Sequence, residues 1–226
     1  MTTARDTILA AVRAGLGTQP VDPARVRQEA AQLLEGIALA RPALASGDVV
    51  DLFAARVVSP KVNASIDRID SLEAVPAAVL RYLATHRLPY RVAVQPTEPL
   101  RRLDWAGFEL QERTAPDEQV GVGLALWGIA ETGSVVFHSS PDTAILAHFL
   151  PLHHLVVVRA DTIVPYLEDW TCAVRAEGQR PPRNVNIITG ASGTTDIEGS
   201  LVLGAHGPKY LHIILVEGAG RRAAVT

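Results

Sequence analysis

The sequence predicts an α/β fold whose largely parallel sheet is covered by helices on both faces. Three segments, residues 134–137, 154–160 and 210–217, are runs of apolar and β-branched residues with little polar alternation. Strands that are buried on both faces have this pattern, which is typical of parallel sheets. Helical patterns separate these runs, and such an alternation of strands and helices indicates a layered α/β architecture.

The first 45 residues are predicted to form a helical extension. Ile8, Leu9, Val12 and Leu16 recur at the spacing of one helical face, and Thr3 is a candidate N-cap. A second apolar stripe over residues 26–37 predicts another helix. We assign residues 1–45 to this extension, 46–220 to one α/β domain and 221–226 to a tail.

The α/β domain is expected to begin with an edge strand within residues 56–67, because this β-branched run contains a proline. The other expected elements are a helix over 75–86, strands over 90–94, 107–113 and 134–137, a helix starting at Ser139 or Ser140 with Pro141 and Asp142 in its first turn, a strand over 154–160, a helix over 163–174, and strands over 184–189 and 210–217.

Composition narrows the classes of function. The net charge of −3 comes from interspersed acidic and basic residues, whereas a nucleic-acid surface needs clustered Lys and Arg. The longest uncharged apolar run, residues 120–130, is too short to span a membrane, and the N-terminus lacks the pattern of a secretory signal. We therefore expect a cytoplasmic protein.

The single cysteine, Cys172, excludes an intramolecular disulfide and an iron–sulfur cluster held by this chain alone, since a cluster normally takes four thiolates. The histidines show no metal-ligand spacing, so no metal site is predicted. The cofactor, if there is one, is left open, as is the number of copies that assemble.

The stretch "GIAETGSVVFHSSPD" places Glu131 directly before an apolar strand. The small residues around it allow a ligand or another backbone to approach closely, and the predicted helix start at Ser139 would offer free N–H groups to an anion. The alternative interpretation is a solvated turn carboxylate, which is the usual environment of a glutamate.

The stretch "TGASGTTD", residues 189–196, follows a predicted strand and would lie at the carboxyl edge of the sheet, where ligands bind. Its glycines and hydroxyls could present backbone amides to a small anion, although it matches neither a Walker loop nor a dinucleotide fingerprint. The alternative is a tight turn followed by a helix that Thr194 or Thr195 caps, with Asp196 and Glu198 in its first turn.

Two histidines near the C-terminus have different environments in the sequence. His206 lies between small residues in "GAHGP", which predicts an accessible imidazole in a turn, either structural or catalytic. His212 lies inside a predicted strand and is interpreted as an outward-facing or hydrogen-bonded residue.

The blocks "GIAETGSVVF", "ITGASGTTDIEGSLVLGAHGP" and "LHIILVE" resemble the LutC/YkgG family of lactate-utilisation (LUD) domain proteins over roughly residues 45–217. The resemblance implies a Rossmann-like sandwich similar to the NagB/RpiA/coenzyme A transferase group. The family's characteristic residues fall on Glu131, Thr132, Gly133, Gly190, Ser192, Thr194, Asp196, Glu198, His206, Gly207 and Pro208. Gly193 stands where the family usually has a basic residue. This chain therefore lacks the cation that could bind a carboxylate or phosphate at that position.

The resemblance implies a role in L-lactate oxidation to pyruvate, alongside iron–sulfur partner proteins that carry the clusters. One alternative is an enzyme related to the coenzyme A transferases that acts on a small carboxylate or acyl-CoA. In it Glu131 would be the nucleophile, Asp196 the base or orienting group, and the other family residues would bind the ligand. A second alternative is a scaffold without chemistry of its own.

Each catalytic interpretation requires two distant segments to meet. We expect the acidic turn after Ala130 and the hydroxyl-rich bend beyond Thr189 to converge at one rim of the central sheet.

Overall fold

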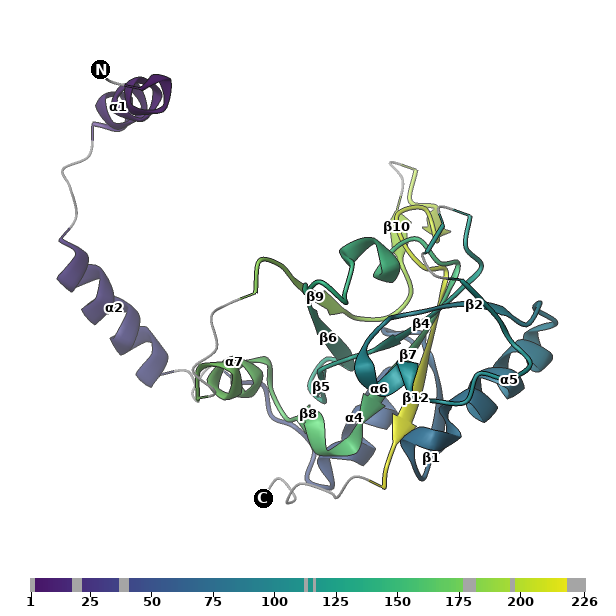
Figure 1. The fold of residues 1–226 in the computed structure, drawn as a ribbon. Helices are drawn as coiled ribbons and strands as arrows, with labels where there is room; N and C mark the ends of the chain where they lie inside the picture. The colour runs from purple at the N-terminus through teal and green to yellow at the C-terminus, as the bar shows by residue number, and fades with distance from the viewer. Residues whose placement is uncertain are drawn as a thin grey trace. The chain divides into compact units, whose positions relative to one another are not determined.

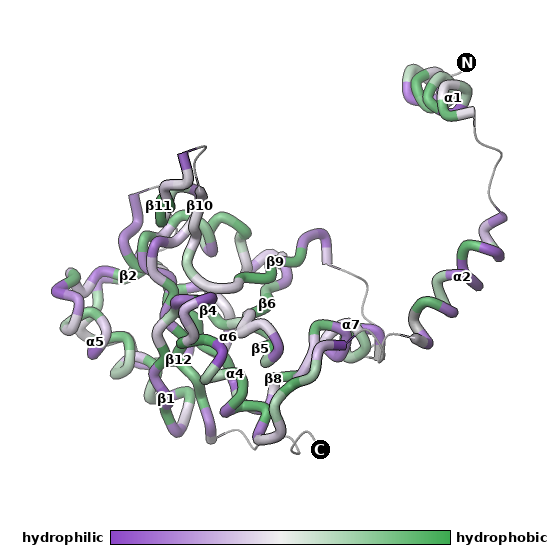
Figure 2. Tube along the Cα trace, turned by 180° about the vertical axis from the view of Figure 1, so that it is seen from behind, coloured by the Kyte–Doolittle hydropathy of each residue, from purple (hydrophilic) through white to green (hydrophobic). Residues whose placement is uncertain are grey.

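The computed structural model describes residues 3–17, 22–36, 41–111, 114–115, 117–176, 182–195 and 198–218. The chain divides into two compact units, Met1–Ala43 and Leu44–Thr226. The first contains α1 (Ala4–Leu16) and α2 (Pro23–Glu35), in which hydrophobic and hydrophilic residues alternate along the helix (Figure 2). Thr3 is the N-cap of α1, as predicted, and forms a capping box with Asp6.

The second unit is built on a six-stranded sheet in which every strand pair is parallel, so the α/β prediction is confirmed (Figure 1). The strand order is β1-β12-β7-β4-β2-β3. The strands are β1 (Ser65–Ile69), β2 (Arg91–Val94), β3 (Glu109–Gln111), β4 (Val120–Leu124), β7 (His153–Arg159) and β12 (Tyr210–Val216).

Helices cover both faces of this sheet because successive side chains of a strand point to opposite sides. On β7, Val156 and Val158 pack in the same core as Phe53 of α4 (Val49–Val57). Leu155 and Val157 pack on the other face with α5 (Val75–His86). The continuous apolar runs of the sequence thus reflect burial on both sides.

A second sheet interrupts the regular alternation of strands and helices. It has the order β8-β5-β6-β9, with β5 (Trp127–Ile129), β6 (Ser134–His138), β8 (Ile163–Val164) and β9 (Val185–Ile188), and its ladders are mostly antiparallel. A separate hairpin pairs β10 (Gly193–Thr195) with β11 (Leu201–Leu203). The described residues also form α6 (Glu98–Arg101), α7 (Leu167–Ala176) and the short 3₁₀ helices η1 (Leu72–Ala74), η2 (Ile145–His148) and η3 (Ala160–Thr162).

The prediction of a helix that starts at Ser139 or Ser140 is wrong. Ser140 and Thr143 instead exchange backbone hydrogen bonds in an isolated bridge, and only η2 follows. Thr143 also accepts a hydrogen bond from the buried Gln95 side chain. The local bridge and the tertiary bond from Gln95 hold Pro141 and Asp142 in a turn, so no helix N-terminus is available there for an anion.

Three other expectations need correction. The alternative in which Thr194 or Thr195 caps a helix is wrong, since both lie in β10 of an extended hairpin. Only the end of the run 56–67 forms the predicted edge strand, because its first two residues complete α4. Ile163, expected in a helix, lies in β8.

No helix in the described ranges is both long and apolar enough to cross a membrane.

Candidate functional site

Two segments that the sequence singled out meet at a chain of three hydroxyl groups. Thr132 Oγ1 and Ser134 Oγ are 2.6 Å apart, and Ser134 Oγ is also 2.6 Å from Thr189 Oγ1. Ser134 begins β6 and Thr189 follows β9, its antiparallel neighbour. The turn after Ala130 and the bend beyond Thr189 therefore converge as expected, but they do so on the four-stranded sheet.

Two glycines fix where this convergence lies. A Cβ atom on Gly190 would lie 2.0 Å from the Val62 carbonyl oxygen, and one on Gly133 would lie 3.2 Å from the Val57 backbone nitrogen. Val62 precedes β1, so the bend lies near the amino end of β1, and its expected position at the carboxyl edge of the sheet is wrong. At both positions the missing side chain lets the backbone pack closely against other segments of this chain.

Glu131, the expected nucleophile, is half-buried in the turn between β5 and β6. Its backbone N–H donates to the Pro165 carbonyl at 3.0 Å, which holds the turn against the segment after β8. Its expected partner, Asp196, lies outside the described residues. Thr194 and Glu198 are exposed, the former in β10 and the latter in the connection to β11.

Ser192, Gly207 and Pro208 come together in a second group. The Ser192 N–H donates to the Pro208 carbonyl at 2.8 Å, and the Gly204 N–H donates to the Ser192 carbonyl at 2.8 Å. A Cβ atom on Gly207 would lie 3.2 Å from Ser192 Cβ. These contacts form a compact turn before β12 in which His206 is exposed, as the sequence predicted.

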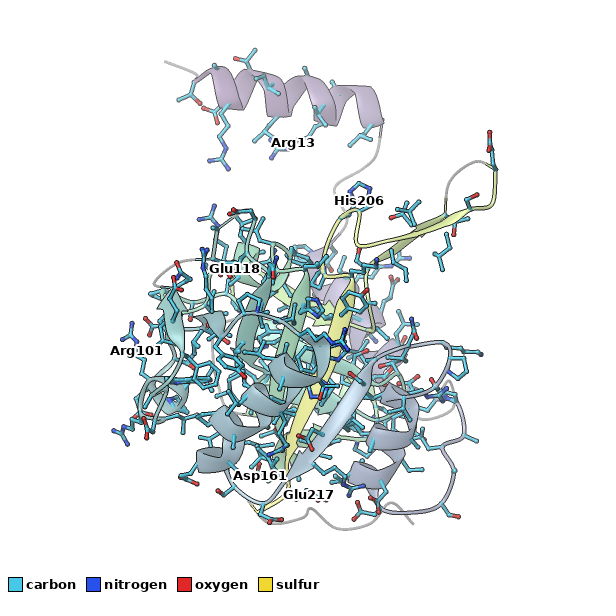
Figure 3. The ribbon with its side chains drawn as sticks, turned by 90° about the vertical axis from the view of Figure 1, so that its right-hand side faces the viewer. Arg13, Arg101, Glu118, Asp161, His206 and Glu217 are labelled. Carbon is cyan, nitrogen blue, oxygen red and sulfur yellow. The ribbon has the colours of Figure 1, made fainter. Side chains whose placement is uncertain are left out.

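An open groove of about 540 Å³ lies beside this turn and is lined by residues 117–119, 149–152 and 204–207. These segments precede β4, β7 and β12, so the groove lies at the amino edge of the central sheet. Figure 3 shows Glu118 and His206 toward one end of the domain, with Asp161 and Glu217, which follow β7 and β12, toward the other. We call this feature the amino-edge groove.

Buried imidazoles lie at the amino ends of β7 and β12. A hydrogen bond of 2.9 Å joins the Tyr82 hydroxyl to His153 Nδ1, and one of 2.8 Å joins Ser65 Oγ to His212 Nδ1. Burial is the main cause that lowers the pKa of both histidines to about 4, and burial also raises the pKa of Tyr82 to about 12. These groups are therefore uncharged near neutral pH, and His212 is hydrogen-bonded within a strand, as interpreted from the sequence.

A second cavity, of about 360 Å³, lies beside the carboxyl ends of β2 and β3. From β2 the chain continues outward to β3, whereas from β4 it continues in the opposite direction to β7 and β12. In open α/β sheets, ligands bind outside the carboxyl ends of the strands at such a reversal of strand order. Here the reversal lies between β2 and β4, and the cavity adjoins it on the side of β2 and β3. We call this cavity the switch-point crevice.

Gln95 organises the switch-point crevice. Its side chain is almost fully buried, its Oε1 accepts the Leu124 N–H at 2.8 Å, and its Nε2 donates to Thr143 Oγ1 at 2.7 Å. Gln95 thus bridges β2, the end of β4 and the segment after β6. Gln111 and Thr114 add further hydrogen-bonding groups to the lining.

A third cavity, of about 500 Å³, adjoins the crevice because both are lined by residues 94–96 and Gln111. Its lining includes Arg101, an exposed residue of α6. Amides and a hydroxyl near one guanidinium suit a small polar organic acid, because a guanidinium binds a carboxylate through charge-assisted hydrogen bonds.

The sequence did not single out Gln95, Gln111 or Arg101. The sequence contains one indication of Gln95: it is a polar residue that lies directly after the predicted strand over 90–94 and directly before Pro96. Among the residues that the structure describes, no group of three or more His, Cys, Asp or Glu side chains could hold a metal ion.

Comparison with known proteins gives related sequences and one related structure. Lactate utilization protein C of Bacillus licheniformis is 33% identical over 127 residues, which cover 54% of this chain and 53% of that protein. Lactate utilization protein C of Bacillus subtilis is 35% identical over 126 residues, with coverages of 54% and 52%. The chain thus spans about half the length of these relatives.

The crystal structure of a DUF162 family protein from Deinococcus radiodurans has a TM-score of 0.54 and 22% sequence identity, and the match covers 74% of this chain and 96% of that one. This similarity supports the α/β fold alone. A family model of the LUD domain matches residues 24–216, which is most of the chain. The resemblance to LutC/YkgG proteins is thereby confirmed, and the chain belongs to the LUD domain family.

Proposed function

We propose that this protein is a subunit of an L-lactate utilisation system and supports oxidation of L-lactate to pyruvate together with iron–sulfur partner proteins. Relatives at 33% and 35% identity are named lactate utilization protein C, which supports the pathway. The assignment of the iron–sulfur clusters to partner proteins is supported by the cysteine content, since Cys172 is the only cysteine in the sequence. Clusters that carry the electrons would need thiolates on the partners.

The observation that carries a ligand-binding role is the switch-point crevice. Its amides and hydroxyl can hydrogen-bond the carboxylate and the 2-oxygen of L-lactate or pyruvate, while Arg101 in the adjoining cavity supplies the positive charge. Asp142 lies at the exposed side of the lining, where solvent screens its repulsion of an anion.

Growth tests the pathway. Deletion of the gene should abolish growth on L-lactate but not on pyruvate, and the wild-type gene should restore it. Affinity purification from lactate-grown cells should recover cysteine-rich iron–sulfur proteins. Unimpaired lactate growth of the deletion strain, in the absence of a second gene of this family, would contradict the proposal.

Calorimetric titration tests the ligand. L-lactate and pyruvate should bind to the purified protein, and propionate, which lacks the 2-oxygen, should bind more weakly. Equal affinities for the three acids would show that the crevice does not recognise the group on which the reaction acts.

A second candidate function is acyl transfer with Glu131 as nucleophile, supported by the half-buried position of Glu131 next to the Thr132–Ser134–Thr189 hydroxyls. The carboxylate would form a bond to the acyl carbon of an acyl-CoA while the carbon–sulfur bond breaks and the thiolate leaves with the electron pair. Asp196 is the proposed base or orienting group. The other family residues, Gly133, Gly190, Ser192, Thr194, Glu198, His206, Gly207 and Pro208, are proposed to bind or shape the ligand site.

A further inference from the structure

The short helix η2 and the residues beside it form an apolar wall of the switch-point crevice. Ala144 directly precedes η2 and Ala147 follows three residues later, so the two share one face of the 3₁₀ helix. Both line the crevice, together with Leu150 and with Leu146, which is 63% exposed. These four side chains contain only carbon and hydrogen, so this part of the crevice offers a ligand apolar contacts.

This wall is held against both sheets. His148 of η2 is 1% exposed, and its ring packs on Phe137 of β6 with 4.0 Å between the ring centroids. A Cβ atom on Gly121 of β4 would lie 3.6 Å from the Ala147 carbonyl oxygen, so η2 lies close to that strand. Because η2 is anchored in this way, the side chains that line the crevice form a preformed surface.

The crevice is larger than L-lactate requires. Its polar part consists of Gln95, Gln111 and Thr114, and its volume is about 360 Å³. Pockets for drug-sized ligands have volumes of about 300–1,000 Å³. L-lactate has a single methyl group beside its carboxylate and hydroxyl, so a bound lactate would leave most of the apolar wall without a ligand contact.

We infer that the switch-point crevice accepts 2-hydroxy acids with a larger, branched alkyl side chain, which packs against Ala144, Ala147 and Leu150. The inference rests on the proposed function, because the same amides and hydroxyl would hold the carboxylate and the 2-oxygen. It extends the substrate class from L-lactate to bulkier apolar homologues. A charged side chain would lose its hydration against the same wall, so the class excludes acids with a second carboxylate.

Calorimetric titration of the full chain tests the class with L-lactate, L-2-hydroxybutyrate and L-2-hydroxy-4-methylpentanoate, which differ only in the side chain. Affinity should rise along this series, and the last acid should bind about tenfold or more tightly than L-lactate, because each buried methylene group adds to the binding free energy. L-malate should bind more weakly than L-2-hydroxybutyrate. Equal or falling affinities along the series would overturn the inference but leave the proposed binding of L-lactate intact, whereas no binding of any acid would overturn both.

A substitution in the wall locates the side chain of the ligand. Ala144 is exposed and has a φ of −70° and a ψ of 129°, which any residue can adopt, so Ala144→Leu spares the core. The added side chain should weaken the binding of L-2-hydroxy-4-methylpentanoate about tenfold and change that of L-lactate less than about twofold. Ala55→Leu, at an exposed position of α4 outside the crevice lining, is the control and should change neither affinity. Equal effects of Ala144→Leu on the two acids would overturn the assignment of this wall to the side chain.

Discussion

The Ser134 hydroxyl lies 2.6 Å from the Thr189 hydroxyl, and this hydrogen bond joins two family motifs that are 55 residues apart in the chain. Ser134 also bonds to Thr132 and is 1% exposed. One buried hydroxyl therefore holds the Glu131 turn and the glycine-rich bend in a fixed relation, so any chemistry that combines the two segments depends on it.

Ser134→Ala should lower the free energy of unfolding by about 1–2 kcal/mol, because it leaves the hydroxyls of Thr132 and Thr189 without their shared partner. Urea unfolding followed by circular dichroism measures the change. Thr194→Ala, at an exposed position of β10, is the control and should change the stability by less than about 0.5 kcal/mol. Equal effects of the two substitutions would contradict a structural role of the hydroxyl chain.

Gly190→Ala should destabilise the protein by about 3 kcal/mol or more, since the new Cβ would lie 2.0 Å from the Val62 carbonyl oxygen. Gly199→Ala is a matched control: its φ of 84° resembles the 79° of Gly190, but no atom lies within 4 Å of its Cβ position. The control therefore shows only the backbone strain of about 1 kcal/mol, and the difference between the two unfolding free energies measures the close approach. A difference near zero would mean that the Val62 segment moves away freely.

Glu131→Gln removes a charge without changing the shape of the side chain. If Glu131 is the nucleophile, acyl transfer should fall by a factor of about 10³ or more, while the melting temperature changes by less than about 2 °C. An acyl-CoA exchange assay and a thermal scan on the same preparation separate the two effects. Full activity in the folded variant would remove Glu131 from the mechanism.

Arg101→Gln should weaken the binding of L-lactate about tenfold, because it removes the positive charge of a residue that lines the cavity beside Gln95. Arg102→Gln is the control, since this neighbouring side chain pairs with Glu98 and does not line the cavity. Calorimetric titration of both variants gives the comparison. Equal affinities in the two variants would show that the carboxylate does not lie near Arg101.

Stability should fall as the pH drops below about 6.5. Burial lowers the pKa of His148 to about 4 and that of His154 to about 3, below the ordinary value of 6.5 that an unfolded chain retains. Between these values the unfolded state binds more protons, so each histidine removes on the order of 3 kcal/mol on full acidification, and its effect is absent above about pH 7. Urea unfolding at pH 7.5, 6 and 5 measures the slope, which His148→Leu should reduce by about one proton. A slope that this variant does not change would contradict the assignment.

Local sequence predicted the elements whose signal needs no distant partner. The runs that became β7 and β12 are continuously apolar over Leu155–Val158 and Ile213–Val216, which are buried on both faces, and Pro76 marks the first turn of α5. The strand next to β2 across the reversal of strand order, β4, has no clear strand pattern in the sequence, because Gly121 and Gly123 weaken such a pattern. In the fold they are required: a Cβ atom on Gly121 would lie 2.5 Å from Pro151 Cγ, and one on Gly123 would lie 3.2 Å from Gln95 Oε1.

Residue types and their order along the chain were enough to predict the α/β class, the burial of the sheet on both faces, the family and the two motifs that meet. The fold was needed to show that the motifs meet on the second sheet, that Gln95 lies beside the reversal of strand order, and that Glu118 Oε2 is buried without a hydrogen-bond donor among the described residues. These properties depend on which distant segments pack together, and packing satisfies or leaves open hydrogen bonds that no local pattern encodes.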